Sequence, residues 1–444
     1  MSRVFPRQIG ADLAVAVDGD GVYIVDRQGR RYLDASGTAA VSCLGYSDGE
    51  VKRALKEQVD RLSFTHSGFF TSEAAEGLAD LLVDSAPTGI GRVYYTSGGS
   101  EAVETALKMS RQYFIEIGEG ERCRYIARRQ SYHGNTLGAL AVGGNRGRRQ
   151  PYHPLLMEAA HISPCYAYRG LAPNENEQAY GARVADELDA MIEELGPQTV
   201  CAFVAETVVG ATAGVVPPVA GYFKRIREIC DRHGVHLILD EVMCGCGRTG
   251  TLHACEQEGI SPDLMALAKG LGAGYQPIGA VLVAEKIYDA FVKGSGVFRH
   301  GHTYMAHPVA CAAALAVQRA IVSRGLLAQV GARGEVLARA LNERFGDHPN
   351  VGDIRGRGLF WGLEMVADRA AKEPFDPALG LHLKIKSRAM EHGLICYPGG
   401  GTADGVKGDH VLLAPPFIVS EGQIAEIVER LAGAIEDALA DIAG

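Results

Sequence analysis

The amino-acid sequence predicts an α/β protein, with a large domain built on a mostly parallel sheet and a smaller α+β domain. Three observations predict this class. Between residues 92 and 286, segments typical of strands alternate with segments typical of helices. The expected strands, such as VHLILDE at 235–241, are almost wholly apolar, as strands buried on both faces of a parallel sheet usually are. After about residue 306 this alternation gives way to long helical segments and glycine-interrupted strands.

The N-terminal region is expected to contribute a hairpin and two helices. The hairpin is predicted within residues 21–36, because two short apolar runs flank the turn RQG at 27–29. Residues 47–61 and 72–84 are expected to be helical, since their apolar residues recur at helical spacing.

The large domain is expected to open with a strand, a tight glycine turn and an amphipathic helix over residues 92–114, RVYYTSGGSEAVETALKMSRQYF. An amphipathic helix at 222–234 ends in a glycine, a common helix terminator. The remaining strands are expected at 124–129, 200–206, 235–241 and 278–286.

The C-terminal region is expected to hold one long helix at 308–347, a strand pair at 351–366, and a final helix at 421–441. A helix and a strand lie between the strand pair and the final helix. The predicted division is an N-terminal segment at 1–50 that joins the small domain, a large domain at 51–305 and the small domain at 306–444.

The composition is that of an ordinary globular protein: 444 residues, 47% hydrophobic and 22% charged. The net charge of -9 argues against a broad nucleic-acid surface or a polybasic membrane patch, so neither partner is expected. No signal peptide or membrane-spanning run is recognised, and the ten cysteines are scattered, which favours a cytoplasmic location. The only close pair, Cys244 and Cys246, has no second pair or neighbouring histidines, and no metal site is expected.

Lys269 is unusual because it lies among small and apolar residues, in LMALAKGLGAGYQ at 264–276. A buried lysine is costly unless it is paired or neutral. Burial also lowers the pKa of an amine and makes it a nucleophile that condenses with a carbonyl group. The alternative is a lysine at a helix end with its charged head in solvent.

Three further stretches bear on Lys269. In SGGSEA at 97–102, Ser100 follows two glycines where a strand becomes a helix, which indicates either a phosphate site or an ordinary helix N-cap. Asp240 ends an apolar strand, where it could pair with a cationic ring nitrogen or bind nearby backbone. Tyr132, in SYHGNT just past another strand, could cover a flat cofactor or serve as a core residue.

Together these residues supply a carbonyl-trapping amine, a phosphate corner, an acid for a ring nitrogen and a stacking aromatic, which are the parts needed to hold pyridoxal 5′-phosphate. At this point the sequence resembles the class III (ω-type) pyridoxal-phosphate aminotransferases of fold type I. The matching stretches are TSGGSEAVETALKMSR, SYHGNTLGAL, AETVVGATAGVVPP, LILDEVMCGCGRTG, PDLMALAKGLGAGYQPIGAV and HGHTYMAHPVACAAALA. They occur in the family's order and cover most of residues 20–430.

The resemblance implies a role for each matching position. Lys269 would bond to the cofactor's aldehyde and later carry the proton, and Asp240 would bind the pyridinium nitrogen. The other positions would hold the cofactor: Val242 and Tyr132 on the two faces of the ring, Gly99 and Ser100 at the phosphate, Thr303 at the phosphate of the partner subunit's cofactor, and Glu206 nearby. The resemblance therefore also implies a homodimer with shared active sites, or a dimer of such dimers.

Several positions depart from the family pattern. Members acting on ω-amino acids with 2-oxoglutarate often carry a glutamate and an arginine where this chain has Ala211 and Leu412, which favours the amine:pyruvate branch. That branch commonly has an arginine shortly before GDH (408–410), where this chain offers Lys407, with Arg299 as a second candidate for the substrate carboxylate. A pocket tryptophan of that branch is replaced near Ala40, which would leave room for a larger amine, so Tyr132, Lys407 and Ala40 are the predicted substrate contacts.

The predicted activity is a ping-pong transamination from a primary amine or ω-amino acid to an α-keto acid, with pyruvate favoured. One alternative is an ω-amino acid transaminase that uses 2-oxoglutarate. A second is another reaction of the same cofactor, such as that of an aminomutase, decarboxylase or racemase. A third is a non-catalytic protein that uses the fold to bind an effector.

Overall fold

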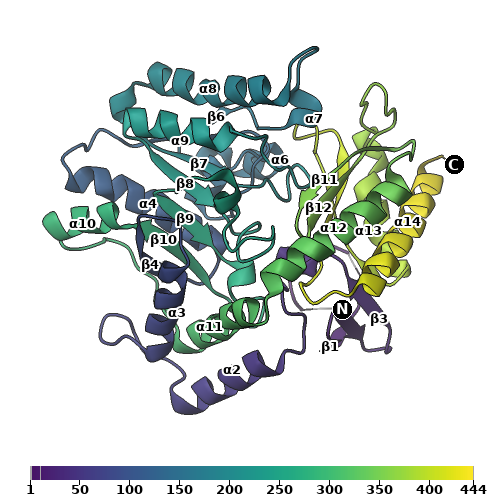
Figure 1. The fold of residues 1–444 in the computed structure, drawn as a ribbon, viewed down its shortest axis with the longest axis horizontal. Helices are drawn as coiled ribbons and strands as arrows, with labels where there is room; N and C mark the ends of the chain where they lie inside the picture. The colour runs from purple at the N-terminus through teal and green to yellow at the C-terminus, as the bar shows by residue number, and fades with distance from the viewer. Residues whose placement is uncertain (1–2, 11, 444) are drawn as a thin grey trace.

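The computed structural model describes residues 3–10 and 12–443, and its largest feature is a seven-stranded sheet (Figure 1). The strand order is β4-β10-β9-β8-β7-β5-β6. The strands are β4 (Ile90–Thr96), β5 (Arg124–Arg128), β6 (Ala160–Ile162), β7 (Val200–Glu206), β8 (His236–Asp240), β9 (Leu264–Leu267) and β10 (Gly279–Ala284). From β9 to β6 the strands are parallel, whereas β10 is antiparallel to both β4 and β9. The predicted alternation of strands and helices is confirmed, although the short strands β6 and β9 had not been predicted.

Helices connect and cover these strands. They are α2 (Gly49–Arg61), α3 (Glu73–Asp84), α4 (Gly99–Glu116), α5 (Leu137–Val142), α6 (Arg146–Arg149), α7 (Ala167–Gly170), α8 (Glu177–Leu195), α9 (Tyr222–His233) and α10 (Glu285–Lys293). Local signals set their ends: the side chain of Ser72 accepts from the N–H of Ala75 at the start of α3, and Gly234 adopts a left-handed φ of 63° at the end of α9. The helices α8 and α9 pack on each other along one side of the sheet (Figure 1).

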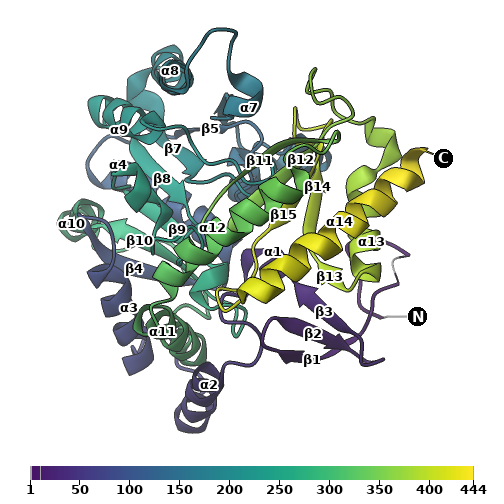
Figure 2. The ribbon, with the colours of Figure 1, turned by 45° about the vertical axis from the view of Figure 1, so that its right-hand side comes forward.

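A second sheet lies in the C-terminal region, with antiparallel order β11-β12-β15-β14. Its strands are β11 (Val351–Arg357), β12 (Phe360–Met365), β14 (Tyr397–Gly400) and β15 (Asp409–Leu413), and its helices are α12 (Leu326–Phe345), α13 (Leu381–Glu391) and α14 (Glu421–Ala443). The predicted strand pair is β11 and β12. Figure 2 shows α12, α13 and α14 around this sheet.

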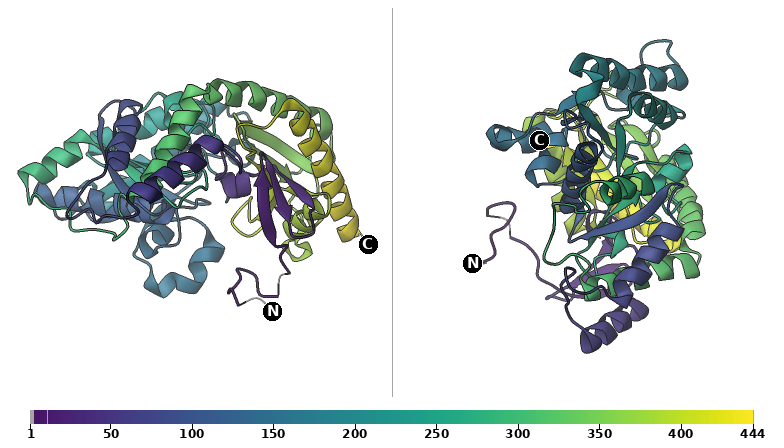
Figure 3. Two further views of the ribbon diagram at one scale, coloured as in Figure 1. Left: turned by 90° about the horizontal axis from the view of Figure 1, so that it is seen from below. Right: turned by 90° about the vertical axis from the view of Figure 1, so that its left-hand side faces the viewer.

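The N-terminal strands join this region. The predicted hairpin is β2 (Tyr23–Asp26) with β3 (Arg31–Asp34), and an unpredicted strand, β1 (Ala16–Asp20), pairs with β2. The strand β13 (Leu394–Ile395) adds to β3 in parallel, so distant parts of the chain share one sheet. The hydroxyl of Tyr23 donates to Oε2 of Glu426 on α14 at 3.2 Å, and Figure 3 shows the N-terminal strands beside that helix.

The predicted helix at 308–347 is wrong in one respect, because two helices occupy this segment. The helix α11 (Pro308–Ser323) ends before Gly325, which takes a left-handed φ of 62°, and α12 then starts at a bend of 68°. Nη1 of Arg324 bonds to Oδ2 of Asp48 at 2.5 Å, which fixes the bend against the start of α2.

No single helix among the described residues is long and apolar enough to cross a membrane. The bent pair α11 and α12 meets the requirements of length and composition only when its two helices are taken together.

Two apolar cores support the division of the chain that we propose, with residues 1–50 and 306–444 forming the small domain and 51–305 the large one. One core lies around the seven-stranded sheet, and the other lies among α12, α14, the small sheet and the N-terminal strands. The helix α11 contributes to both, since Ala310 and Ala314 pack in the first core and Val317 and Ile321 in the second.

Candidate active site

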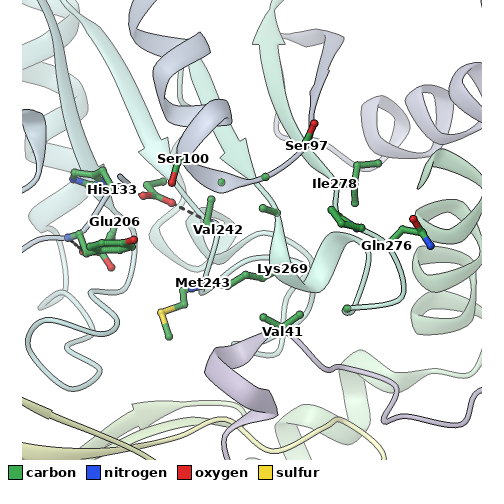
Figure 4. Close-up of a pocket in the computed structure, with 18 residues that line it drawn as sticks. Val41, Ser97, Ser100, His133, Glu206, Val242, Met243, Lys269, Gln276 and Ile278 are labelled. Atoms are coloured by element: carbon green, nitrogen blue, oxygen red, sulfur yellow. Dashed lines mark hydrogen bonds and ion pairs between the residues drawn. The ribbon is translucent and has the colours of Figure 1, made fainter. Parts of the chain in front are cut away.

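A cavity of about 370 Å³ lies at the carboxyl ends of β7, β8 and β9, where open α/β sheets usually bind their ligands. Figure 4 shows this cavity with Lys269 between the side formed by His133 and Glu206 and the side formed by Gln276 and Ile278. Seven residues predicted to hold a cofactor line it together: Gly99, Ser100, Tyr132, Glu206, Asp240, Val242 and Lys269. The sheet thus brings together residues that span more than a third of the chain.

Lys269 follows β9 on a tight turn. Its own φ is 43°, in the left-handed region, and its carbonyl accepts the N–H of Ala273 at 2.8 Å. Nε2 of Gln318, on α11, donates to the carbonyl oxygens of Gly270 and Leu271 at 3.0 and 2.9 Å. A buried side chain from another element therefore holds the turn that presents the lysine, and the sequence motifs had not indicated Gln318.

The environment of Lys269 favours an uncharged amine. The side chain is half-buried by the cavity walls, and burial lowers the pKa of the Lys269 amine below its ordinary value of 10.5. The carboxyl groups of Asp240 and Glu206 act in the opposite direction without cancelling this effect. The amine is therefore a better nucleophile at a given pH than an exposed lysine.

Asp240 is the last residue of β8 and is held by two hydrogen bonds. Oδ1 accepts the N–H of Val242 at 3.0 Å, and Oδ2 lies 2.8 Å from Nδ1 of His133. Both side chains are buried, and among the described residues Nε2 of His133 has no hydrogen-bond partner. Sequence reasoning missed His133, whose only signal was its place beside Tyr132 in SYHGNT.

Glu206 ends β7 and is also buried, although no clear role had been predicted for it. Its Oε1 accepts the N–H of Tyr132 at 3.2 Å, and its Oε2 accepts the N–H of Gly210 at 2.8 Å. Burial raises the pKa of the Glu206 carboxyl, against the opposing influence of His133 and the Gly210 N–H. The structure thus shows that Glu206 holds the backbone from which the Tyr132 side chain projects.

The glycine corner at the start of α4 is closely packed. A Cβ atom at Gly99 would lie 2.8 Å from Cγ1 of Val242, and one at Gly134, where φ is 133°, would lie 2.6 Å from Oγ of Ser100. Only glycine leaves this space open. The first N–H groups of the 18-residue helix α4 lack partners from a preceding turn, so they are available to an anion in the cavity.

Comparison with known proteins decides the family. The chain matches the Aminotransferase class-III family over residues 5–435. It is 48% identical to an uncharacterized aminotransferase of Schizosaccharomyces pombe, over 96% of this chain and 93% of that protein. The protein belongs to the class III aminotransferases. The family resemblance predicted from the motifs is thereby confirmed.

Two further relatives of this aminotransferase define its fold and cofactor. A diaminobutyrate–2-oxoglutarate transaminase of Halomonas elongata is 34% identical, over 96% of this chain and 91% of that protein. The solved structure of an ω-transaminase from Pseudomonas jessenii in complex with PMP has a TM-score of 0.92 and 32% identity, covering 100% of this chain and 97% of that one. The predicted fold type I architecture is confirmed, and the aminotransferase is a pyridoxal-phosphate-dependent transaminase.

The residues of the cavity fit this cofactor. The glycine corner leaves room for a phosphate at a helix N-terminus, and the side chain of Val242 lies beside it. Asp240 and the amine of Lys269 line the same space, so a carboxylate and a nucleophilic amine are both within the cavity. The donor set is therefore suited to an anionic, aldehyde-bearing ring with a basic nitrogen.

A second, wider cavity of about 680 Å³ continues from the first. Tyr132, Met243 and Lys269 line both cavities, so they form the junction between them. Ala211 lines the wide cavity as well, and its small side chain offers no charge there.

The predicted substrate contact at Ala40 does not hold in this structure, because Ala40 is buried in an apolar cluster with Val208 and Met243 and lines neither cavity. Its neighbours Ala39 and Val41 line the wide and the narrow cavity, respectively. The reason is local: residues 38–40 all have positive φ, so the chain turns sharply here and directs Ala40 toward the core.

Lys407 and Arg299 also lie away from both cavities. Both are exposed, and the N–H of Lys407 donates to Oδ1 of Asp404 at 2.7 Å in a tight turn beyond the cavity wall. Leu412 is buried in β15, so it presents no polar group to a substrate. Thr303 is exposed and lines neither cavity of its own subunit.

The glycine corner yields a first test. Gly99→Ala should raise the Kd for pyridoxal phosphate about tenfold, because the added methyl group must push Val242 into the cofactor's space at a cost of about 1–3 kcal/mol. The measurement is a titration of the apoenzyme followed by absorbance. The matched control is Gly49→Ala at the start of α2, where a Cβ atom would meet no neighbour within 4 Å. Equal affinities in the two variants would show that the corner does not hold the phosphate.

Proposed function

We propose that the enzyme transfers an amino group from a primary amine or ω-amino acid to an α-keto acid, with pyruvate favoured, by a ping-pong mechanism. The observation that carries this proposal is the position of Lys269 at the junction of two cavities. The narrow cavity suits the cofactor, and the wide one has room for an extended substrate.

The cofactor, when bound, supplies an aldehyde that condenses with amines and a ring that withdraws electrons from the substrate carbon. Lys269 would hold the cofactor's aldehyde until the donor amine takes its place, and its freed amine would then accept the proton from the donor's carbon and return it. Its lowered pKa favours the uncharged form that both tasks require. The keto acid repeats these steps in reverse and leaves as the new amine.

The other residues of the narrow cavity hold the cofactor. Asp240, oriented by His133, would keep a proton on the ring nitrogen. Val242 and Tyr132 would contact the two faces of the ring, and Glu206 would position Tyr132 through its backbone. The N–H groups at Gly99 and Ser100 would bind the phosphate.

The role of Lys269 is tested by Lys269→Ala. Turnover should fall to background, because no other amine lines the cavity among the described residues, while the cofactor stays bound through its phosphate and ring contacts. Borohydride reduction followed by mass spectrometry should label Lys269 in the unmodified enzyme and nothing in the variant. Substantial turnover by the variant would contradict the assignment.

The acceptor preference is supported by two apolar positions. Ala211 lines the wide cavity and Leu412 is buried, so neither offers a partner for the second carboxylate of 2-oxoglutarate. Pyruvate has only one carboxylate to satisfy. The name of the relative from Halomonas elongata favours the alternative, 2-oxoglutarate, and the two acceptors are distinguished by experiment.

We expect kcat/KM for pyruvate to exceed that for 2-oxoglutarate by about tenfold or more, because an unpaired carboxylate in a partly dry site costs on the order of 1 kcal/mol or more. Both acceptors are measured against one amine donor in the same buffer. Faster turnover with 2-oxoglutarate would reverse the assignment.

A homodimer with shared active sites is supported by exposed aromatic side chains. Phe69 and Phe70 are 81% and 70% exposed, and Tyr304, which is 62% exposed, lies edge-on to Phe64. Tyr304 also lines a cavity of about 250 Å³ that shares Ser97 with the narrow cavity. A second copy covering these rings would lie beside the phosphate corner, where Thr303 would reach its partner's cofactor.

Phe70→Asp should therefore convert the dimer to a monomer and remove most of the activity, because it places a charge in an apolar interface. Sedimentation velocity and activity are measured on the same samples. The control is Val292→Asp on α10, an apolar position that is 60% exposed and lies away from these aromatics. If either variant, Phe70→Asp or Val292→Asp, were a monomer with full activity, the shared site would be refuted.

We also place the enzyme in the cytoplasm. All ten cysteines are free, and nine of them are buried, as is usual for proteins of a reducing compartment. Cell fractionation with an antibody to the enzyme would test this location.

A further inference from the structure

One wall of the wide cavity is a tight turn in the segment between β7 and α9. Ala211 and Thr212, in the middle of this turn, line the cavity. The turn is closed by Val209 and Val216, whose N–H groups donate to each other's carbonyls at 3.1 and 2.9 Å. Val215 has a φ of 54°, in the left-handed region that β-branched residues rarely adopt. The turn is therefore strained, and it needs contacts from outside to keep its shape.

The same turn is connected to the cofactor side of the site. The N–H of Gly210 donates to Oε2 of Glu206 at 2.8 Å, and Oε1 of Glu206 accepts the N–H of Tyr132 at 3.2 Å. Tyr132 in turn lines both cavities. A shift of the turn would therefore change the wall of the wide cavity and, through Glu206, the backbone position of Tyr132.

A side chain of the second sheet holds the turn from outside. Arg355 lies on β11, and its guanidinium donates from Nη2 to the carbonyl of Ala213 at 2.5 Å and from Nε to the carbonyl of Val215 at 3.0 Å. The third nitrogen, Nη1, binds Oε2 of Glu364 and Oδ2 of Asp353, both at 2.8 Å. The Arg355 side chain is only 10% exposed, so little water competes for these bonds. The planar fork of arginine reaches all these acceptors at once, which a lysine cannot do.

Glu364 anchors Arg355 on its own sheet. It lies on β12, where the ladder pairs it with Asp353 of β11, and its side chain is fully buried. It also accepts from Nε of Arg169 at 2.5 Å and from the hydroxyl of Tyr166. The acids thus fix one nitrogen of Arg355 within the second sheet, and its other two nitrogens are directed at the turn.

We propose that Arg355 is a positioning residue that sets the substrate-facing wall of the wide cavity by holding the turn at 209–216. This inference rests on the proposed transaminase function, because that function assigns the wide cavity to the amine donor. Arg355 lines neither cavity, so it acts on the substrate only through the residues of the turn.

The test is Arg355→Lys, which keeps a charge beside Glu364 but cannot hold both carbonyls. Hydrogen exchange followed by mass spectrometry should show the amides of residues 208–216 exchanging about tenfold faster, because a strained turn that has lost a hydrogen bond opens more readily. With pyruvate and the amine of highest kcat/KM, the amine KM should rise about five- to tenfold, while kcat changes less than about threefold. The Kd for pyridoxal phosphate should stay within about twofold, because the phosphate corner lies on α4, away from the turn.

The matched control is Arg357→Lys. Arg357 lies two residues further along β11 and, like Arg355, it binds a buried glutamate and a carbonyl. Its Nη1 bonds to Oε1 of Glu258 at 2.6 Å, and its Nη2 donates to the carbonyl of Pro218 at 3.2 Å, outside the turn. Exchange at 208–216 and the amine KM should therefore stay as in the unmodified enzyme.

Two further variants separate the hydrogen bonds to the turn from the buried ion pairs. Arg169→Lys disturbs Glu364 without removing a bond to the turn, so it should leave exchange at 208–216 and the amine KM unchanged. The double variant Arg355→Met with Glu364→Gln removes two opposite charges together, which avoids an unpaired buried charge if Arg355→Lys fails to fold. It should give the faster exchange and the higher amine KM expected of Arg355→Lys.

Three results would overturn the inference: unchanged exchange at 208–216 without Arg355, equal effects of Arg355→Lys and Arg357→Lys, or a fall in kcat at constant KM, as loss of folded enzyme alone would cause. All three leave the transaminase function standing, because nitrogen transfer is still observed. By contrast, if the unmodified enzyme transferred no nitrogen from any amine to either keto acid, the proposed function would be refuted, and the role of Arg355 toward the substrate with it.

Discussion

The register of the parallel strands is the constraint on which the active site depends. The ladder pairs Glu206 of β7 with Asp240 of β8, and Asp240 in turn with Ala266 of β9. Two carboxyl groups therefore end side by side at one edge of the sheet, and Lys269 follows three residues after the next rung. A slip of one residue would turn each acid to the other face of the sheet and separate it from the lysine.

This register places the two acids in different surroundings. Asp240 is held by His133 and the Val242 N–H, whereas Glu206 is held by two backbone N–H groups, and burial raises its pKa. In the function that we propose, Asp240 would face the cofactor's ring, whereas Glu206 fixes the backbone at Tyr132 and Gly210. The lysine between them keeps a lowered pKa because burial outweighs both charges.

Much of this arrangement could be predicted from the sequence, because it depends on local patterns. Apolar strands, a glycine corner and an acid at a strand end are readable in single stretches, and they led to Lys269, Asp240 and Ser100. The contacts of His133 and Gln318 could not be predicted in the same way. Each joins segments far apart in the chain, such as His133 with Asp240, and depends on how elements pack. The turn at Ala40 and the helix break at Gly325 were missed because both depend on the backbone conformation of one or a few residues.

The shared helix α11 has a consequence for how the molecule comes apart. Its N-terminal half packs in the core around the large sheet and its C-terminal half in the core of the smaller region. Loss of this helix would expose apolar side chains of both cores to water at once, so neither core keeps its full stability without the other. The cavity therefore belongs to a region that unfolds cooperatively. The stability of the active site depends on residues such as Ile321, which lie outside the cavity.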